Sequence, residues 1–182
     1  YKPSGGGGIK PFIISTLYTV GLSLLIATPI GVLSAVYLQE YAKQGKLVRV
    51  IRYSTEALAG IPSIVYGLFG AAFFVSALKF GYSLIAGSLT LSIIILPVII
   101  RTTEESLKVV PPSYREASLG LGATRFQTLY KVILPSAIPG ILSGVILSMG
   151  RLIGESAALF LTAGTVYKIP KSIMSSGRTL TV

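Results

Sequence analysis

Three ionisable residues stand in or at the edge of otherwise apolar segments of this 182-residue sequence, and they are the main candidates for chemistry. Arg151 and Glu155 are four residues apart, which predicts that they share one face of a helix. Arg101 ends another apolar run. Charged side chains in such surroundings are costly unless they pair with each other or face a polar cavity. Two hypotheses follow: a buried Arg151–Glu155 pair that only fixes helix packing, or a path in which both arginines bind the oxygens of an oxyanion.

The composition excludes most enzyme classes. Asp, Asn, His, Cys and Trp are absent, which removes imidazole and thiolate catalysis, disulfides and the usual nitrogen and sulfur metal ligands. A phosphate-binding Gly-x-x-x-x-Gly-Lys-Ser/Thr loop is also absent, and the run Gly5–Gly8 has the character of a flexible linker. We therefore expect no enzyme, no catalytic residue, no metal site and no cofactor.

Long uncharged runs indicate a membrane protein. The sequence is 52% hydrophobic and 12% charged, and crossing a bilayer takes roughly 20 apolar residues. The runs show almost none of the polar faces that a soluble helix bundle would need. We predict an all-α, polytopic transmembrane helix bundle with a single domain over residues 1–182. The expected spans are about 11–39, 57–79, 82–109 and 133–162, and the row Ser136, Gly140 and Gly144 favours close packing of helices.

The net charge of +10 fits basic loops beside membrane spans better than nucleic-acid binding. Nine Lys and Arg residues lie within 40–56 and 101–131, which alternate with the expected spans. Six lie on the opposite side of the membrane in this arrangement: Lys2, Lys10, Lys79, Lys168, Lys171 and Arg178. This bias places both loops in the cytoplasm and both ends of the chain outside. We expect a multi-pass protein of the plasma (inner) membrane, in contact with the lipid bilayer.

Residues 111–131, between two of the expected spans, contain signals for two short helices. Pro111–Pro112 stop the preceding helix, and Ser113–Glu116 has the pattern of a capping box. Gly120 and Gly122 end that helix, and Thr124–Gln127 forms a second box. Seven to ten helical residues are too few to hold together alone in water. The first helix therefore rests either on its own bundle or on another protein.

At these residues the sequence resembles a known family. The spacing of Glu116-Ala117-Ser118, Gly122 and the run Val132–Pro135 is similar to the Glu-Ala-Ala loop of binding-protein-dependent ABC importer permeases. Ser118 and Val132 depart from the usual Ala and Ile but keep their size or character. The resemblance implies that Glu116, Ala117, Ser118 and Gly122 belong to a cytoplasmic coupling helix that docks on a separate ATPase subunit. We therefore name residues 111–131 the coupling segment.

Three other segments resemble the A-type permease of the phosphate-specific ABC importer: 59–70, 96–111 and 150–155. The resemblance covers nearly the whole chain and implies a type I ABC importer permease fold, with one further span at each end. It also implies that inorganic phosphate passes Arg101, Arg151 and Glu155. The implied partners are a sister permease, two cytoplasmic ATPase subunits and an extracytoplasmic phosphate-binding protein.

Two alternatives remain open. The first is an ABC permease for another oxyanion or small solute. The second is a self-contained channel or secondary transporter, which would normally show an internal repeat with broken helices meeting at the midplane of the membrane. We find no convincing repeat between the two halves of the sequence.

Overall fold

The computed structural model describes residues 9–166 and 174–182, and within these ranges the regular structure is entirely helical. The linker Gly5–Gly8 and the charges Lys2, Lys168 and Lys171 lie outside the described residues. The predicted all-α fold class is confirmed.

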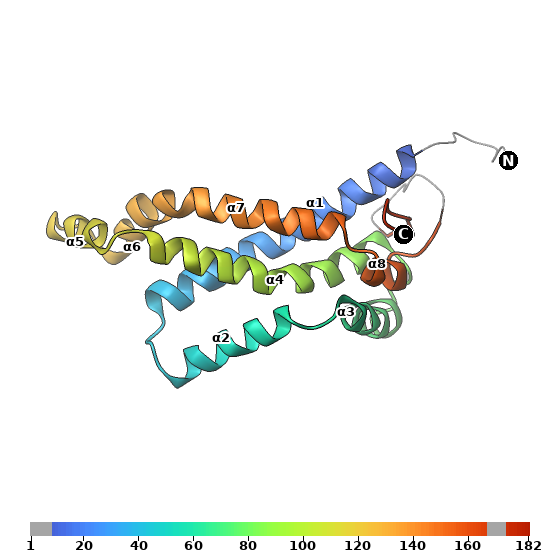
Figure 1. Ribbon diagram of the computed structural model, residues 1–182, viewed down its shortest axis with the longest axis horizontal. Helices are drawn as coiled ribbons and strands as arrows, with labels where there is room; N and C mark the ends of the chain where they lie inside the picture. Colours follow the sequence, from blue (N-terminus) through green and yellow to red (C-terminus); the bar gives the residue numbers. More distant parts are fainter. Residues whose placement is uncertain (1–8, 167–173) are drawn as a thin grey trace.

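Three long apolar helices make up most of the bundle, two of them nearly parallel to its long axis and the first in the chain crossing them obliquely (Figure 1). Each is long and apolar enough to cross a membrane. Their parts are α1 (Lys10–Val36) with the π-helical turn η1 (Tyr37–Tyr41), α4 (Leu84–Val109), and the continuous series α6 (Arg125–Thr128), η3 (Leu129–Ile133) and α7 (Leu134–Ile153). They cover most of the spans expected over 11–39, 82–109 and 133–162.

The span expected over 57–79 is broken. α2 (Lys46–Ala59) ends within its first few residues, and α3 (Ser63–Gly70) continues through the π-helical segment η2 (Ala71–Ala77) at an angle of 96° to α2. The cause is the sequence Gly60-Ile61-Pro62, because proline lacks an amide hydrogen and disfavours helical backbone at the residue before it.

The helix expected over 133–162 also differs at both ends. It begins at Arg125, because the second capping box starts a helix that runs without interruption into α7. It ends at Ile153, and α8 (Ala157–Thr162) follows as a separate short helix after Gly154. Glu155 therefore lies between helices and not on the face of α7.

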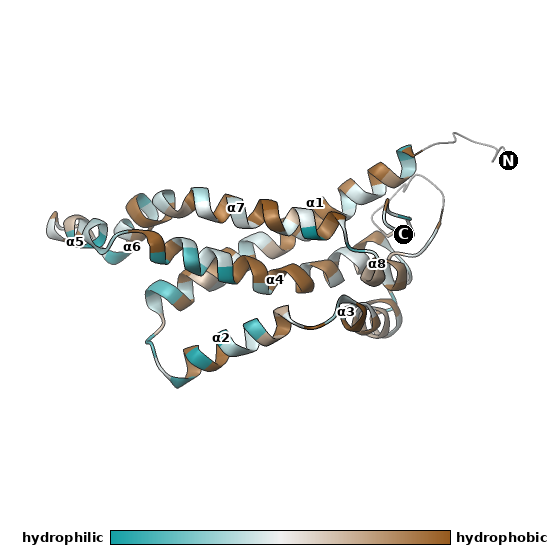
Figure 2. Cartoon of the chain, viewed as in Figure 1, coloured by the Kyte–Doolittle hydropathy of each residue, from teal (hydrophilic) through white to brown (hydrophobic). Residues whose placement is uncertain are grey.

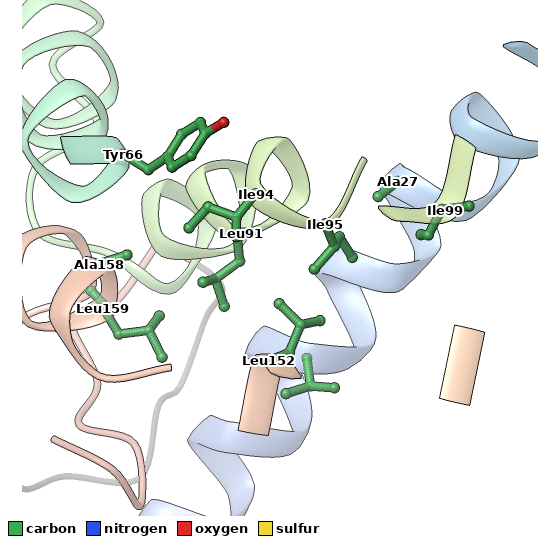
Figure 3. Close-up of a cluster of buried hydrophobic side chains, with 11 residues drawn as sticks. Ala27, Tyr66, Leu91, Ile94, Ile95, Ile99, Leu152, Ala158 and Leu159 are labelled. Atoms are coloured by element: carbon green, nitrogen blue, oxygen red, sulfur yellow. The ribbon is translucent and has the colours of Figure 1, made fainter. Parts of the chain in front are cut away.

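α4 is the central helix. Figure 3 shows side chains of α4, including the fully buried Leu91 and Ile95, packed against side chains from α1, α3, α7 and α8. Small polar residues join α4 to α1: Ser23 Oγ donates to the carbonyl of Ser88 at 3.1 Å, and Ser92 Oγ donates to the carbonyl of Ser23 at 3.2 Å. Such small residues let two helices approach closely without water between them.

The outer faces of the long helices are apolar, whereas hydrophilic residues gather towards the end that carries α5 (Pro112–Gly120) and α6 (Figure 2). Leu25 and Leu33 of α1 and Ile146 and Leu147 of α7 are each at least two-thirds exposed. Exposed apolar side chains on this scale need lipid or a protein partner around them.

Candidate functional site

The first helix of the coupling segment stands out from the end of the bundle and has no buried residue. Its predicted capping box is wrong: α5 begins at Pro112 with Pro111 as its N-cap, and no side chain caps it. Proline is suited to the first turn of a helix because its backbone angle is already helical and its missing amide needs no acceptor. Ser113 is therefore inside the first turn.

The turn after α5 agrees with the sequence. Gly122 adopts a left-handed backbone with φ +84°, which favours glycine. The second capping box is confirmed. The backbone amide of Gln127 donates to Thr124 Oγ1 at 3.2 Å, and the backbone amide of Thr124 donates to Gln127 Oε1 at 2.9 Å. Glu116 and Ala117 are exposed, whereas the hydroxyl of Ser118 lies 2.9 Å from that of Thr128. Ser118 thus joins α5 to α6, whereas Glu116 and Ala117 face outwards.

Arg115 belongs to this segment but is not one of its motif residues. Its guanidinium lies 2.6 Å from Glu40 Oε1, at the end of α1, and also donates to the carbonyls of Leu107 and Val110 at 3.2 Å each. Glu40 is 75 positions away in the sequence. The one local signal is an arginine placed five to eight residues after the last carbonyls of α4, where a cation is favoured.

Arg101 lies in a groove of about 380 Å³ between α2 and α4. Its side chain is 60% exposed and forms ion pairs with Glu105 at 3.1 Å and with Glu56 at 3.2 Å. One turn further along α4, Glu104 is buried and pairs with Arg52 of α2 at 3.1 Å. Both α2–α4 pairs were missed in the sequence because their partners are 45 and 52 residues apart. They attach α2 to the C-terminal half of α4.

Arg151 and Glu155 are not arranged as the spacing predicted. Because α7 ends at Ile153, they do not share a helix face, and no ion pair joins them within the described ranges. Glu155 Oε1 instead accepts from the amide of Ala158 at 3.4 Å, near the start of α8. Arg151 is exposed on the last turn of α7. The hypothesis of a buried Arg151–Glu155 pair is therefore wrong.

The register between α4 and α7 gives the separation of the two arginines. A Cβ added at Gly144 would lie 2.8 Å from Cβ of Thr102, and one added at Gly140 would lie 2.9 Å from Cβ of Ser106. In this antiparallel register, Arg151 is level with residue 95 of α4. Arg101 is then six residues, or about 9 Å, nearer the end that carries α5.

Comparisons with known proteins agree with this arrangement of helices. The family model described as "Binding-protein-dependent transport system inner membrane component" matches residues 27–181. The chain is 44% identical over 88% of its length to the "Probable ABC transporter permease protein YqgI" of Bacillus subtilis, and 43% identical over 88% to the "Phosphate transport system permease protein PstA" of Pasteurella multocida. The chain spans about half the length of these curated relatives, 55% and 57%.

The fold is also similar to a solved transporter. A structure described as "Inward facing conformations of the MetNI methionine ABC transporter" superimposes with a TM-score of 0.67 at 27% identity, covering 83% of this chain and 70% of that one. The helices, the exposed coupling segment and the family match lead to one assignment. The chain is a multi-pass membrane protein with the type I ABC importer permease fold, and it belongs to the family of binding-protein-dependent transport system inner membrane components.

Proposed function

We propose that the chain is the permease subunit of an ATP-driven importer that passes inorganic phosphate from an extracytoplasmic binding protein to the cytoplasm by alternating access. The observation that carries this proposal is the coupling segment: α5 has no buried residue and presents Glu116 and Ala117 outwards. A helix of nine residues is too short to be stable by itself and is suited to a groove on another protein. ATP would be hydrolysed by that separate subunit.

The partners follow from this role. The exposed face of α5, with Ser118 and Gly122 setting its connection to α6, would dock on a cytoplasmic ATPase. A sister permease would complete the membrane pathway, and both would lie in the plasma (inner) membrane. An exposed docking helix supports this role over a self-contained channel or secondary transporter, which needs no such surface.

Phosphate as the substrate is supported by the chemistry of the two arginines and by relatives that carry phosphate transport in their names. A guanidinium offers paired donors that fit two oxygens of a tetrahedral anion. Arg151 would meet the anion first, and Arg101, about 9 Å further along, would meet it second. Glu155 would repel a fully ionised anion but accept a hydrogen bond from a protonated phosphate. Another oxyanion or a small solute is the alternative, since a similar solved structure is described as a methionine transporter.

Reconstitution tests the proposal directly. The full-length permease, its sister permease and the ATPases are placed in vesicles, and uptake of radiolabelled phosphate is measured with ATP and the phosphate-binding protein. We expect ATP-dependent phosphate uptake, with sulfate and methionine in equal concentration taken up at less than a tenth of that rate. Faster uptake of either competitor would refute phosphate as the substrate, and uptake without the ATPase would refute the importer class.

A further inference from the structure

One guanidinium joins the coupling segment to the ends of two membrane helices. Arg115 of α5 donates to Glu40 Oε1 at 2.6 Å, to the carbonyl of Leu107 at 3.2 Å and to the carbonyl of Val110 at 3.2 Å. We name this cluster the Arg115 brace. The side chains of Arg115 and Glu40 are 25% and 16% exposed, so water reaches them only partly.

The brace supplies hydrogen-bond donors to carbonyl groups at the C-terminal end of α4. The last carbonyls of a helix have no partner within it, and they carry the negative end of the helix dipole. Arg115 supplies donors to the carbonyl of Leu107, in the last turn of α4, and to that of Val110, which follows it. Hydrogen bonds from a charged donor are stronger than neutral ones. The same guanidinium also binds Glu40 of η1, a segment 75 positions earlier in the sequence that is not adjacent to α5 along the chain.

Without the brace, α5 could change its angle to α4 about the short connection between the two helices. Val110 and Pro111 are both extended, with ψ 121° and 138°, so a two-residue connection joins α4 to α5. α5 buries no residue of its own, and apart from the brace it contacts α6, through Ser118, and the following segment η3. A push on α5 could rotate it about this connection and leave α1 and α4 where they are. Arg115, which belongs to α5, fixes the angle between α5 and α4. Its guanidinium contacts the last turn of α4, the connection that follows it and η1 at the end of α1.

We infer that Arg115 is the positioning residue that turns movement of the coupling segment into movement of the α1–α4 pair, with Glu40 as its anchor. The inference rests on the proposed function, in which an ATPase moves α5. Loss of the brace should leave α5 able to dock but should let it pivot, so that ATP hydrolysis and transport separate. The quantity to measure is therefore phosphate imported per ATP hydrolysed.

The variants are Arg115→Gln and Glu40→Ala, with Lys131→Gln as the control. Lys131 is an exposed cation of the same cytoplasmic segment, and its replacement removes one charge without touching the brace. We expect all three complexes to assemble and keep basal ATPase activity within twofold of wild type. Phosphate imported per ATP should fall at least tenfold in Arg115→Gln and Glu40→Ala and stay unchanged in Lys131→Gln. Arg115→Lys should be intermediate, since one ammonium cannot span the acceptors that a guanidinium reaches.

A covalent tether between positions 40 and 115 distinguishes loss of the brace from general destabilisation of the protein, because only loss of the brace should be reversed by the tether. These 182 residues contain no cysteine, so the double variant Glu40→Cys/Arg115→Cys, made in a background with any other cysteine replaced by serine, can be joined by a flexible bis-methanethiosulfonate linker about as long as the two side chains it replaces. We expect the untethered double variant to behave as Arg115→Gln does. Tethering should restore at least half of the wild-type import per ATP, and a reducing agent should abolish the recovery.

A failure of the inference is distinct from a failure of the proposed function. Import per ATP within twofold of wild type in Arg115→Gln and Glu40→Ala, or no rescue by the tether, would overturn the brace. If the wild-type complex itself imports no phosphate, the proposed function fails, and the brace is tested without transport. A spin label at the exposed Ser113 should then become more mobile in Arg115→Gln and not in Lys131→Gln, and equal mobility would overturn the inference.

Discussion

The contact between α4 and α7 sets the spacing of the two arginines, and a single methyl group should disturb it. In Gly144→Ala the new Cβ would lie 2.8 Å from Cβ of Thr102, whereas ordinary contacts begin at 3.4 Å. A change of rotamer cannot relieve this contact, because the position of a Cβ is fixed by the backbone of α4. The helices must therefore separate by about 0.6 Å, the difference between the two distances. Forcing an extra methyl into a tightly packed contact costs about 1–3 kcal/mol.

The matched control is Gly150→Ala on the same helix, where the added Cβ would meet open space, with no atom of another described segment within 4 Å. Both variants gain about 1 kcal/mol from replacing glycine by alanine inside a helix, so this term cancels in their difference. We expect Gly144→Ala to be less stable than Gly150→Ala by about 1–3 kcal/mol, with a melting temperature lower by roughly 2–4 °C per kcal/mol. The assay is thermal unfolding of the purified full-length permease in detergent. A Gly144→Ala melting temperature equal to or above that of Gly150→Ala would refute the close α4–α7 contact.

Further predictions concern coupling, orientation and the anion path. Glu116→Lys and Gly122→Glu should insert normally but abolish ATPase stimulation by phosphate-loaded binding protein, because they change the exposed face of α5 or the left-handed turn after it; normal stimulation in both would contradict this. Single cysteines at Gly45 and Ser118 should be labelled from the cytoplasm only, and labelling of Gly45→Cys from outside intact cells would reverse the topology. Arg151→Gln should reduce phosphate uptake at least tenfold in assembled complexes, and wild-type uptake would leave this arginine without a role in the path.

Features governed by neighbouring residues could be predicted from the sequence. The second capping box needs only Thr124 and Gln127, and the turn at Gly122 needs only a glycine that tolerates a positive φ. The central helix α4 follows from its long apolar run. The box predicted at Ser113 did not form, because Pro112 provided a helix start two residues earlier than that box would give.

Features that depend on distant pairs could not be predicted in this way. Arg115 and Glu40 are 75 positions apart, and Arg52 and Glu104 are 52 apart, so their meeting depends on how helices are arranged in space. The spacing of Arg151 and Glu155 was misleading for a different reason. A four-residue interval places two side chains on one face only if the helix continues, and α7 ends between them.

The distribution of ion pairs gives the proposed anion path a direction. Arg101 is held by Glu56 and Glu105, so a bound anion would have to compete with two carboxylates. Arg151 has no ion-pair partner within the described ranges, and Glu155, the acid nearest to it in sequence, is directed towards the start of α8. An anion would therefore be held more firmly at the outer arginine than at the inner one. Weak retention at Arg101 favours release, because the two glutamates take the guanidinium back as the anion leaves.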